Sequence, residues 1–493
     1  MKKAFKIIYI IIFFIICAAP LCLMPIAPSN AEIEKRELTK FPAYMEEGRL
    51  NVDFSNQFES WLNDRIPYRA ELLAASNMLK SELLHAPSSN VIVGKDGWLF
   101  YETESADYMD TNAMTDDQIK AAAVTLSLIE EAIEDKGGHF LFVPMPNKAS
   151  IYGEYMPSCY KQAAENNLSR LTEALKSYHV SFADMKELLT KYKDEGLYHR
   201  RDSHWNYKGA LLGYYTIVNM LKGEYKDYSS ASVNKVKDWR ADLDKLLYPA
   251  GGFMDYQYYY DIDYDNFMFV SPAGVRDTKE QLLNFMSDKE QGDDFFKTKN
   301  REIKDGSSLY MVRDSFGRAL LPFMIDNYED AAFKRTDCPD VNSIAEGTDL
   351  CYEIVERNLA RIISTAPFMY APERAEAPAG SDASSGSCTA VCTKEGYGVR
   401  IYGAFDEGTD MGDARVYLEL ENTVGTLTYE AFPIYESKLM NKDAGETLNE
   451  SGDETAKKGF SAIISNEEGL SGEYTLRVIV GGRVYDGGKI SVN

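Results

Sequence analysis

The segment Tyr310–Gly317 reads Tyr-Met-Val-Arg-Asp-Ser-Phe-Gly, which is an apolar strand that runs into a serine and a small-residue turn. Earlier in the chain, Arg201–Trp205 reads Arg-Asp-Ser-His-Trp. This segment offers an aspartate and a histidine close enough to work as a pair. Because a serine hydroxyl is a weak nucleophile, it needs such a base and a group that orients the base. The two segments together supply all three roles.

Helical and strand patterns alternate around these two segments. The predicted strands cover 139–144, 180–184 and 309–312, and the predicted helices cover 116–136, 165–178 and 206–221. The wholly apolar run at 139–144 is typical of a strand buried on both faces of a parallel sheet. The alternation predicts an α/β three-layer domain with a parallel sheet. Ligands of such sheets bind at the carboxyl ends of the strands, where we expect both segments.

A chain of 493 residues is too long for one core and indicates two or three domains. The stretch 371–387 is rich in Ala, Pro, Glu, Gly and Ser and indicates a linker. In the sequence beyond it, apolar and polar residues alternate as they do in strands. The predicted organisation is a signal peptide or membrane anchor (1–31), a helical N-terminal extension (32–90), the α/β domain (91–370), the linker (371–387) and an all-β sandwich (388–493). This last domain could bind carbohydrate or envelope.

The N-terminus carries an export signal. Lys2, Lys3 and Lys6 precede an almost unbroken apolar run at 7–27, and Ser29-Asn30-Ala31 has the form of a cleavage site. The apolar run is also long enough to span a bilayer. Both alternatives, a cleaved signal and a retained anchor, predict an extracytoplasmic protein that is secreted or held at the cytoplasmic membrane.

Charge and cysteine content narrow the classes of partner and cofactor. A formal net charge of −24 argues against nucleic acid or an anionic membrane surface as the main partner. Export permits disulfides, and Cys338–Cys351 and Cys388–Cys392 are the closest pairs in sequence, whereas we interpret Cys159 as a buried apolar residue. With five histidines and no CxxC pair, we expect neither a metal nor a cofactor.

Each candidate residue also has a plainer interpretation. Asp314-Ser315 has the pattern of a helix N-cap, and Asp202 could cap a helix that begins near His204. His199 could join Asp202 and His204 as a metal ligand, although three ligands so close in one loop are geometrically awkward. The tyrosine-rich stretch 256–264 could stack on sugar rings or form an ordinary amphipathic surface.

The segment Asp202–Trp205 resembles the Asp-His-His-Trp motif of the DHHW family, with Ser203 in place of the first histidine. The segments 64–69, 93–101 and 146–157 are similar to parts of the SGNH-type alginate O-acetyltransferase group, the AlgX/AlgJ-like proteins. The likeness covers roughly residues 50 to 370. In that group the Asp-x-His motif precedes the nucleophilic serine along the chain, as it does here.

This resemblance implies an SGNH-hydrolase-like fold with Ser315 as nucleophile, His204 as base and Asp202 as orienter. The Gly of the group's Gly-Asp-Ser block is replaced here by Arg313. The backbone N–H of Ser315 is the expected oxyanion donor. Candidates for the second donor are Arg318 and Asn147-Lys148.

The implied activity is that of an extracytoplasmic O-acetyltransferase that acetylates hydroxyls of a cell-envelope or exported polysaccharide through an acetyl-serine intermediate. A multi-spanning membrane-bound O-acyltransferase would supply the acetyl group, and the N-terminal segment, if uncleaved, would hold the protein at the membrane. Two rivals remain at this stage. One is an SGNH-type carbohydrate acetyl esterase, and the other is a non-catalytic glycan-binding or scaffold protein of polysaccharide biosynthesis.

Overall fold

The computed structural model describes residues 91–248, 252–263, 266–271, 274–277, 295–378, 384–406, 408–435 and 458–492, with shorter stretches before residue 91. The predicted signal peptide or anchor at 1–31 lies largely outside the described residues. Within the described part, no helix is long and apolar enough to cross a membrane.

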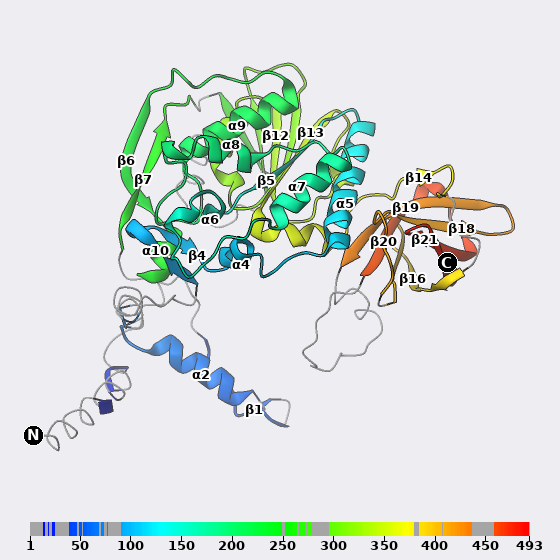
Figure 1. Cartoon of the computed structure of the whole chain (residues 1–493), viewed down its shortest axis with the longest axis horizontal. Coiled ribbons are helices and arrows are strands. Elements are labelled where there is room, and N and C mark those ends of the chain that lie inside the picture. The colour runs from blue at the N-terminus through cyan, green and yellow to red at the C-terminus, as the bar shows by residue number, and fades with distance from the viewer. Residues whose placement is uncertain are drawn as a thin grey trace, which may run out of the picture.

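A seven-stranded mixed sheet forms the middle of the larger domain (Figure 1). In spatial order its strands are β5 (Phe140–Met145), β13 (Thr348–Val355), β11 (Ser308–Arg313), β12 (Asp330–Arg335), β10 (Phe295–Asn300), β8 (Phe267–Ser271) and β9 (Gly274–Asp277). The first four strands pair in parallel, and the last three extend the sheet antiparallel. The α/β prediction is therefore confirmed, but the sheet is not wholly parallel.

Helices cover both faces of this sheet, which makes three layers (Figure 1). One face carries α5 (Asp116–Asp135) and α7 (Asn167–Ser177), and the other carries α8 (Met185–Lys191) and α9 (Tyr207–Lys222). Side chains of β11 alternate between the two cores, because successive strand residues point to opposite faces. Tyr310 and Val312 enter the core with α5, while Leu309 and Met311 enter the core with α9.

Smaller elements surround the site end of this domain. They are β3 (Val91–Val93), β4 (Leu99–Tyr101), α4 (Glu104–Met109), α6 (Lys148–Ile151), β6 (Val233–Arg240), α10 (Asp242–Leu247), β7 (Met254–Tyr260) and α12 (Leu321–Met324). Preceding them are β1 (Met45–Glu46), β2 (Arg49–Leu50) and α2 (Phe54–Arg65). In the tyrosine-rich stretch, Tyr256 is exposed, whereas Tyr259 and Tyr260 pack against the core.

Two local expectations from the sequence are wrong. The segment 180–184 makes only a single β-bridge, Phe142 with Phe182, because Asp184 already caps α8 and turns the chain into that helix. Cys159 is exposed rather than buried. The cysteines of the two closest sequence pairs are free thiols.

The C-terminal part is all-β, as predicted. Its strands run β15 (Ser384–Ser387), β22 (Arg483–Val492), β21 (Gly472–Val480), β18 (Val416–Glu421), β19 (Thr426–Tyr435), β20 (Lys458–Ser465), β17 (Gly398–Ala404) and β16 (Thr389–Lys394), with β14 (Glu373–Arg374) on β19. The sheet curls until β16 lies against β22. Within the predicted linker, β14 and β15 are thus strands of this sheet.

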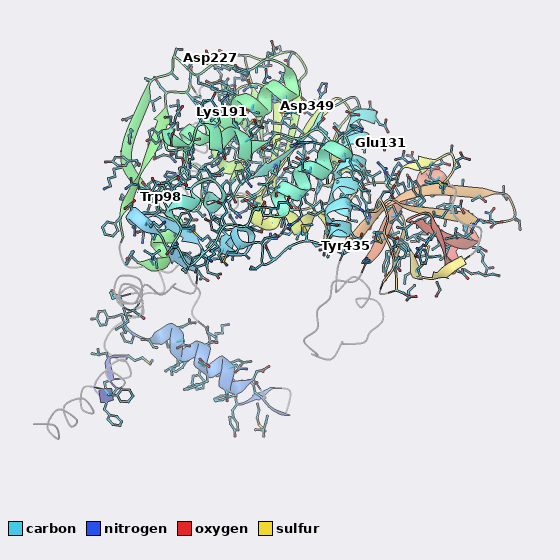
Figure 2. All side chains as sticks on the ribbon, in the orientation of Figure 1. Trp98, Glu131, Lys191, Asp227, Asp349 and Tyr435 are labelled. Carbon is cyan, nitrogen blue, oxygen red and sulfur yellow. The ribbon has the colours of Figure 1, made fainter. Side chains whose placement is uncertain are left out.

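A charged contact joins the two parts, near the Glu131 label in Figure 2. Arg374 binds Glu131 of α5 through two nitrogens and binds the buried Glu430 of β19. Arg415 also pairs with Glu430. A buried carboxylate with two guanidinium partners ties β14 and the β-sheet to α5.

Candidate active site

The three residues predicted as nucleophile, base and orienter form one hydrogen-bonded row. Ser315 Oγ lies 2.8 Å from His204 Nε2, and His204 Nδ1 lies 2.7 Å from Asp202 Oδ1. The Asp202 side chain is 3% exposed and that of His204 is 23% exposed. Ser315 is half-buried, so the row is closed at Asp202 and accessible at the serine and the imidazole.

Ser315 stands in a sharp turn directly after β11. Glu353 of the neighbouring strand β13 accepts hydrogen bonds from the backbone N–H groups of Asp314 and Gly317, both at 3.0 Å. The carboxylate of Asp314 accepts from Phe316 N at 2.7 Å and from Val355 N at 2.9 Å. A Cβ added to Gly317 would come within 2.7 Å of both Arg313 Cβ and Glu353 Oε2, so the turn closes only around glycine here.

The loop that carries Asp202 and His204 is anchored by its own aromatic neighbour. Trp205 is 1% exposed, and its Nε1 donates to the backbone oxygen of Phe316 at 3.0 Å. The ring of Phe316 in turn lies 4.9 Å from that of His204. The tryptophan of the sequence motif thus fixes the distance between base and nucleophile.

Lys148 holds the other side of this loop. Its ammonium is buried and donates to the backbone oxygens of His199, Arg200 and Asp202, at 3.3, 3.2 and 2.6 Å. The stem of the side chain brings Nζ to within 5.2 Å of the Phe100 ring. Three ammonium donors meet three carbonyl acceptors, which fixes the backbone just ahead of His204.

The second carboxylate oxygen of Asp202 is also occupied. Asp202 Oδ2 accepts from Trp239 Nε1 and from the backbone N–H of Asp242, both at 2.9 Å. Its Oδ1 accepts from the backbone N–H of His204 at 3.1 Å as well as from the ring. With four donors on one buried carboxylate, its position and its charge are both fixed.

The electrostatics match this arrangement. Burial by itself would raise the pKa of Asp202, but the hydrogen bond and charge of His204 outweigh it and hold that pKa well below the ordinary range. Burial would likewise lower the pKa of His204, and its bond to Asp202 outweighs this and raises the pKa above 6.5. Each partner therefore favours the charged form of the other.

Asp202 and Ser315 do not act as helix caps in the structure. Asn206, not Asp202, caps α9 by accepting from the backbone N–H groups of Lys208 and Gly209. Neither the 3-10 helix Gly317–Ala319, which directly follows Ser315, nor α12 has a side-chain N-cap. Both motif residues are thus free for the hydrogen-bonded row.

The metal alternative involves a different third residue from the one predicted. His199 stacks on Trp239, with ring centroids 5.1 Å apart, and lies outside any such cluster. In the described part of the chain, the group with metal-ligand spacing is Asp202, His204 and Asp242. Their ligand atoms are already hydrogen-bonded within the protein, so we assign them no metal.

Asn147 and Lys148, two of the candidates for a second oxyanion donor, lie beside the site rather than in it. Asn147 is buried, donates to Asp107 and accepts from Arg357, and Lys148 faces the loop carbonyls. The guanidinium of Arg357 lies 5.5 Å from the centroid of the Phe316 ring, and its charge acts on His204. Arg357, like Trp239 and Glu353, has no sequence signal, since nothing in its spacing links it to either motif.

The comparisons with known proteins agree with this fold. Residues 91–246 match the family model described as the SGNH hydrolase-like domain of the acetyltransferase AlgX. The matched range includes Asp202 and His204 and ends before Ser315. The chain is also 25% identical over 192 residues to the probable alginate O-acetylase AlgJ of Pseudomonas aeruginosa. That match covers 38% of this chain and 46% of AlgJ, so the chain spans just under half of its relative.

Two solved structures are similar at a looser level. A DHHW family protein from Eubacterium siraeum is 17% identical with a TM-score of 0.42, and the match covers 56% of this chain and 93% of that one. PatB1 of Bacillus cereus is 16% identical with a TM-score of 0.44, and the match covers 55% and 96%. Similarity at this level carries no information on function. Residues 91–246 are thus similar to the SGNH hydrolase-like domain of the AlgX/AlgJ-like group.

Proposed function

We propose that this protein is an extracytoplasmic O-acetyltransferase that moves acetyl groups onto hydroxyls of a polysaccharide, with Ser315 as the nucleophile. The observation that carries the proposal is the row Asp202–His204–Ser315, with contacts of 2.7 and 2.8 Å and a buried aspartate at its closed end. A buried aspartate, an oriented imidazole and a hydroxyl within reach are the parts that acyl transfer requires.

In the first half-reaction, His204 Nε2 takes the proton of Ser315 as Oγ attacks the acetyl carbonyl carbon. The bond from the acetyl carbon to the donor's leaving oxygen breaks, and His204 returns the proton to that oxygen. Asp202 stabilises the transient imidazolium through Nδ1, as the raised pKa of His204 indicates. The product is an acetyl ester on Ser315.

In the second half-reaction, a sugar hydroxyl loses its proton to His204 and attacks the same acetyl carbon. The ester bond to Ser315 breaks, and the serine oxygen recovers a proton from His204. Among the described residues, the backbone N–H of Ser315 meets no acceptor, whereas Phe316 N and Gly317 N donate to carboxylates. This free N–H is our candidate donor to the oxyanion in both steps.

The proposed partners are those that the resemblance to the AlgX/AlgJ-like group implies. A polysaccharide is the acceptor, and a multi-spanning membrane-bound O-acyltransferase delivers the acetyl group across the membrane. The protein would meet both outside the cytoplasm, either secreted or anchored through its N-terminal segment.

The experiment follows the fate of the acetyl group. Purified protein and the Ser315→Ala variant are given p-nitrophenyl acetate with a panel of oligosaccharides, and acetylated sugar and free acetate are both quantified. We expect acetylated sugar with the wild type and none above background with Ser315→Ala.

Two other outcomes would contradict the proposal. Release of acetate alone, dependent on Ser315, would make the protein an esterase in which water is the acceptor. Equal behaviour of wild type and Ser315→Ala would remove the nucleophile and favour a glycan-binding or scaffold role.

A further inference from the structure

Two carboxylates, not one, face the Nδ1 side of His204. Asp242, the first residue of α10, places Oδ2 3.5 Å from His204 Nδ1 on the side away from Ser315. Asp202 Oδ1 lies closer to the same nitrogen, at 2.7 Å. The two aspartates are also joined, because the backbone N–H of Asp242 donates to Asp202 Oδ2.

Ser203 links Asp242 to the motif. Its Oγ donates to Asp242 Oδ2 at 2.5 Å and lies 3.2 Å from His204 Nδ1. Its backbone N–H donates to Asp242 Oδ1 at 2.8 Å. Ser203 is the residue that departs from the Asp-His-His-Trp motif, so the bridge to Asp242 belongs to this chain's version of the loop.

We propose that Asp242 is a second orienting carboxylate for His204, which it positions and charges through the Ser203 bridge and which partly replaces Asp202 when that residue is removed. This inference rests on the proposed function, in which His204 serves Ser315. Asp242 touches neither nucleophile nor substrate, so it is a positioning residue.

The charges around Asp242 support this role. Partial burial and the neighbouring Asp202 carboxylate raise the pKa of Asp242 to about 6, while His204 and the Ser203 bonds act in the opposite direction. Lys148 on α6 and Glu104 on α4 also interact electrostatically with Asp242. The charge of Arg357 acts to lower the pKa of His204. Asp242 is thus an anion at neutral pH, with His204 as the cation it faces when the imidazole is protonated.

The deciding test is the titration of His204 by NMR in wild type, Asp242→Asn and Asp227→Asn. The chain has only five histidines, so His204 can be assigned with a His204→Gln variant. An asparagine at 242 keeps an oxygen for the Ser203 N–H but loses the charge. We expect the pKa of His204 to fall by about half a unit in Asp242→Asn.

The control carboxylate is matched in type and distant in place. Asp227 binds Ser229 and Tyr215 at the other end of the domain, near its label in Figure 2. Its removal leaves the pKa of His204 unchanged. An unchanged pKa in Asp242→Asn as well would overturn the inference.

A double-mutant cycle then measures how far Asp242 replaces Asp202 in catalysis. The rate of Ser315 acetylation by p-nitrophenyl acetate is compared for wild type, Asp242→Asn, Asp202→Asn and the double variant. Loss of the orienting carboxylate in a triad lowers the rate about 10⁴-fold when nothing replaces it. We expect about threefold for Asp242→Asn, about 10²-fold for Asp202→Asn and about 10⁴-fold for the double variant.

The outcomes separate the inference from the function on which it rests. Asp202→Asn as slow as the double variant, in an enzyme whose wild type is acetylated, would overturn the second orienter and leave the proposed function intact. A shifted His204 pKa in a protein that is never acetylated at Ser315 would support Asp242 as a second orienter and contradict the proposed function.

Discussion

The turn that carries Ser315 is held by a hydrogen-bond acceptor, whereas the loop that carries His204 is held by a hydrogen-bond donor. In the turn, backbone N–H groups of Asp314 and Gly317 point at the carboxylate of Glu353. In the loop, backbone carbonyls point at the ammonium of Lys148. Both holders are buried and come from neighbouring elements, β13 and α6.

The turn and the loop depend on Glu353 and Lys148 in different ways. The pKa of Glu353 lies well above its usual range, because burial and the nearby Asp314 carboxylate disfavour its charge, so a neutral acid can hold the turn. An ammonium has three donors, and all three are used by the loop. The turn therefore needs an acceptor oxygen, whereas the loop needs the whole charged group.

The largest effect is expected from Lys148→Met, which removes the ammonium that binds the loop. Three buried carbonyls lose their donor, and Asp202 is no longer fixed ahead of His204. We expect a loss of about 2–4 kcal/mol in the free energy of unfolding and about 10²-fold slower acetylation of Ser315. Denaturant titration and the initial acetylation rate measure the two effects.

The matched control is Lys191→Met, which removes an exposed lysine of α8 in the same domain. It should leave both quantities unchanged. A Lys148→Met variant as stable and as fast as this control would contradict the role of the ammonium.

The pH dependence of acetylation is a second, smaller effect. His204 must be neutral to act as base, and its pKa in the folded protein is raised above 6.5. The rate should therefore increase as the pH rises through this raised pKa. Burial lowers the pKa of Lys148 to about 8, so its hold on the loop weakens as the pH rises further. We expect a bell-shaped profile of the single-turnover rate, and Lys148→Met should lack the limb near pH 8. An identical alkaline limb in that variant would assign the limb to another group.

The smallest effect is expected from Glu353→Gln, which tests whether an acceptor oxygen alone is enough to hold the turn. A glutamine keeps the oxygen that binds Asp314 N and Gly317 N, and it matches the neutral acid in shape. We expect less than about 1 kcal/mol of change, whereas Glu353→Leu leaves two buried N–H groups unpaired at about 1–3 kcal/mol each.

The same pair of variants has a pH signature. The pKa of Glu353 in the folded protein exceeds its ordinary 4.5, so its contribution to stability is complete below pH 4.5 and is lost as the pH rises toward the folded pKa. Glu353→Gln removes that dependence. Equal destabilisation by Gln and Leu, measured by denaturant titration at pH 7, would contradict the view that the turn needs only an acceptor oxygen at position 353.

The sequence predicted the parts of the site that lie in short local patterns. Asp202 and His204 are two residues apart, and Ser315 follows an apolar strand, so spacing and periodicity indicated them. The helix at 206–221 and its cap Asn206 were predicted on the same basis and are confirmed. The AlgX/AlgJ-like resemblance is confirmed by the match over 91–246.

The residues that hold the site were beyond prediction because they come from distant elements. Lys148, Trp239 and Glu353 act through backbone groups or through one hydrogen bond each, and such contacts leave no period in a sequence. The mixed sheet was missed for a related reason, since strand direction depends on the connection between strands. The bridge at Phe182 shows that a short apolar run can lie beside a strand and still turn into a helix.

The most direct test of the central claim is intact mass spectrometry after brief exposure to p-nitrophenyl acetate. Wild type and Ser315→Ala are compared, followed by peptide mapping of the modified chain. The account predicts one acetyl group on wild type, mapped to Ser315, and none on Ser315→Ala. Equal acetylation of both proteins, or an acetyl group mapped to another residue, would contradict it.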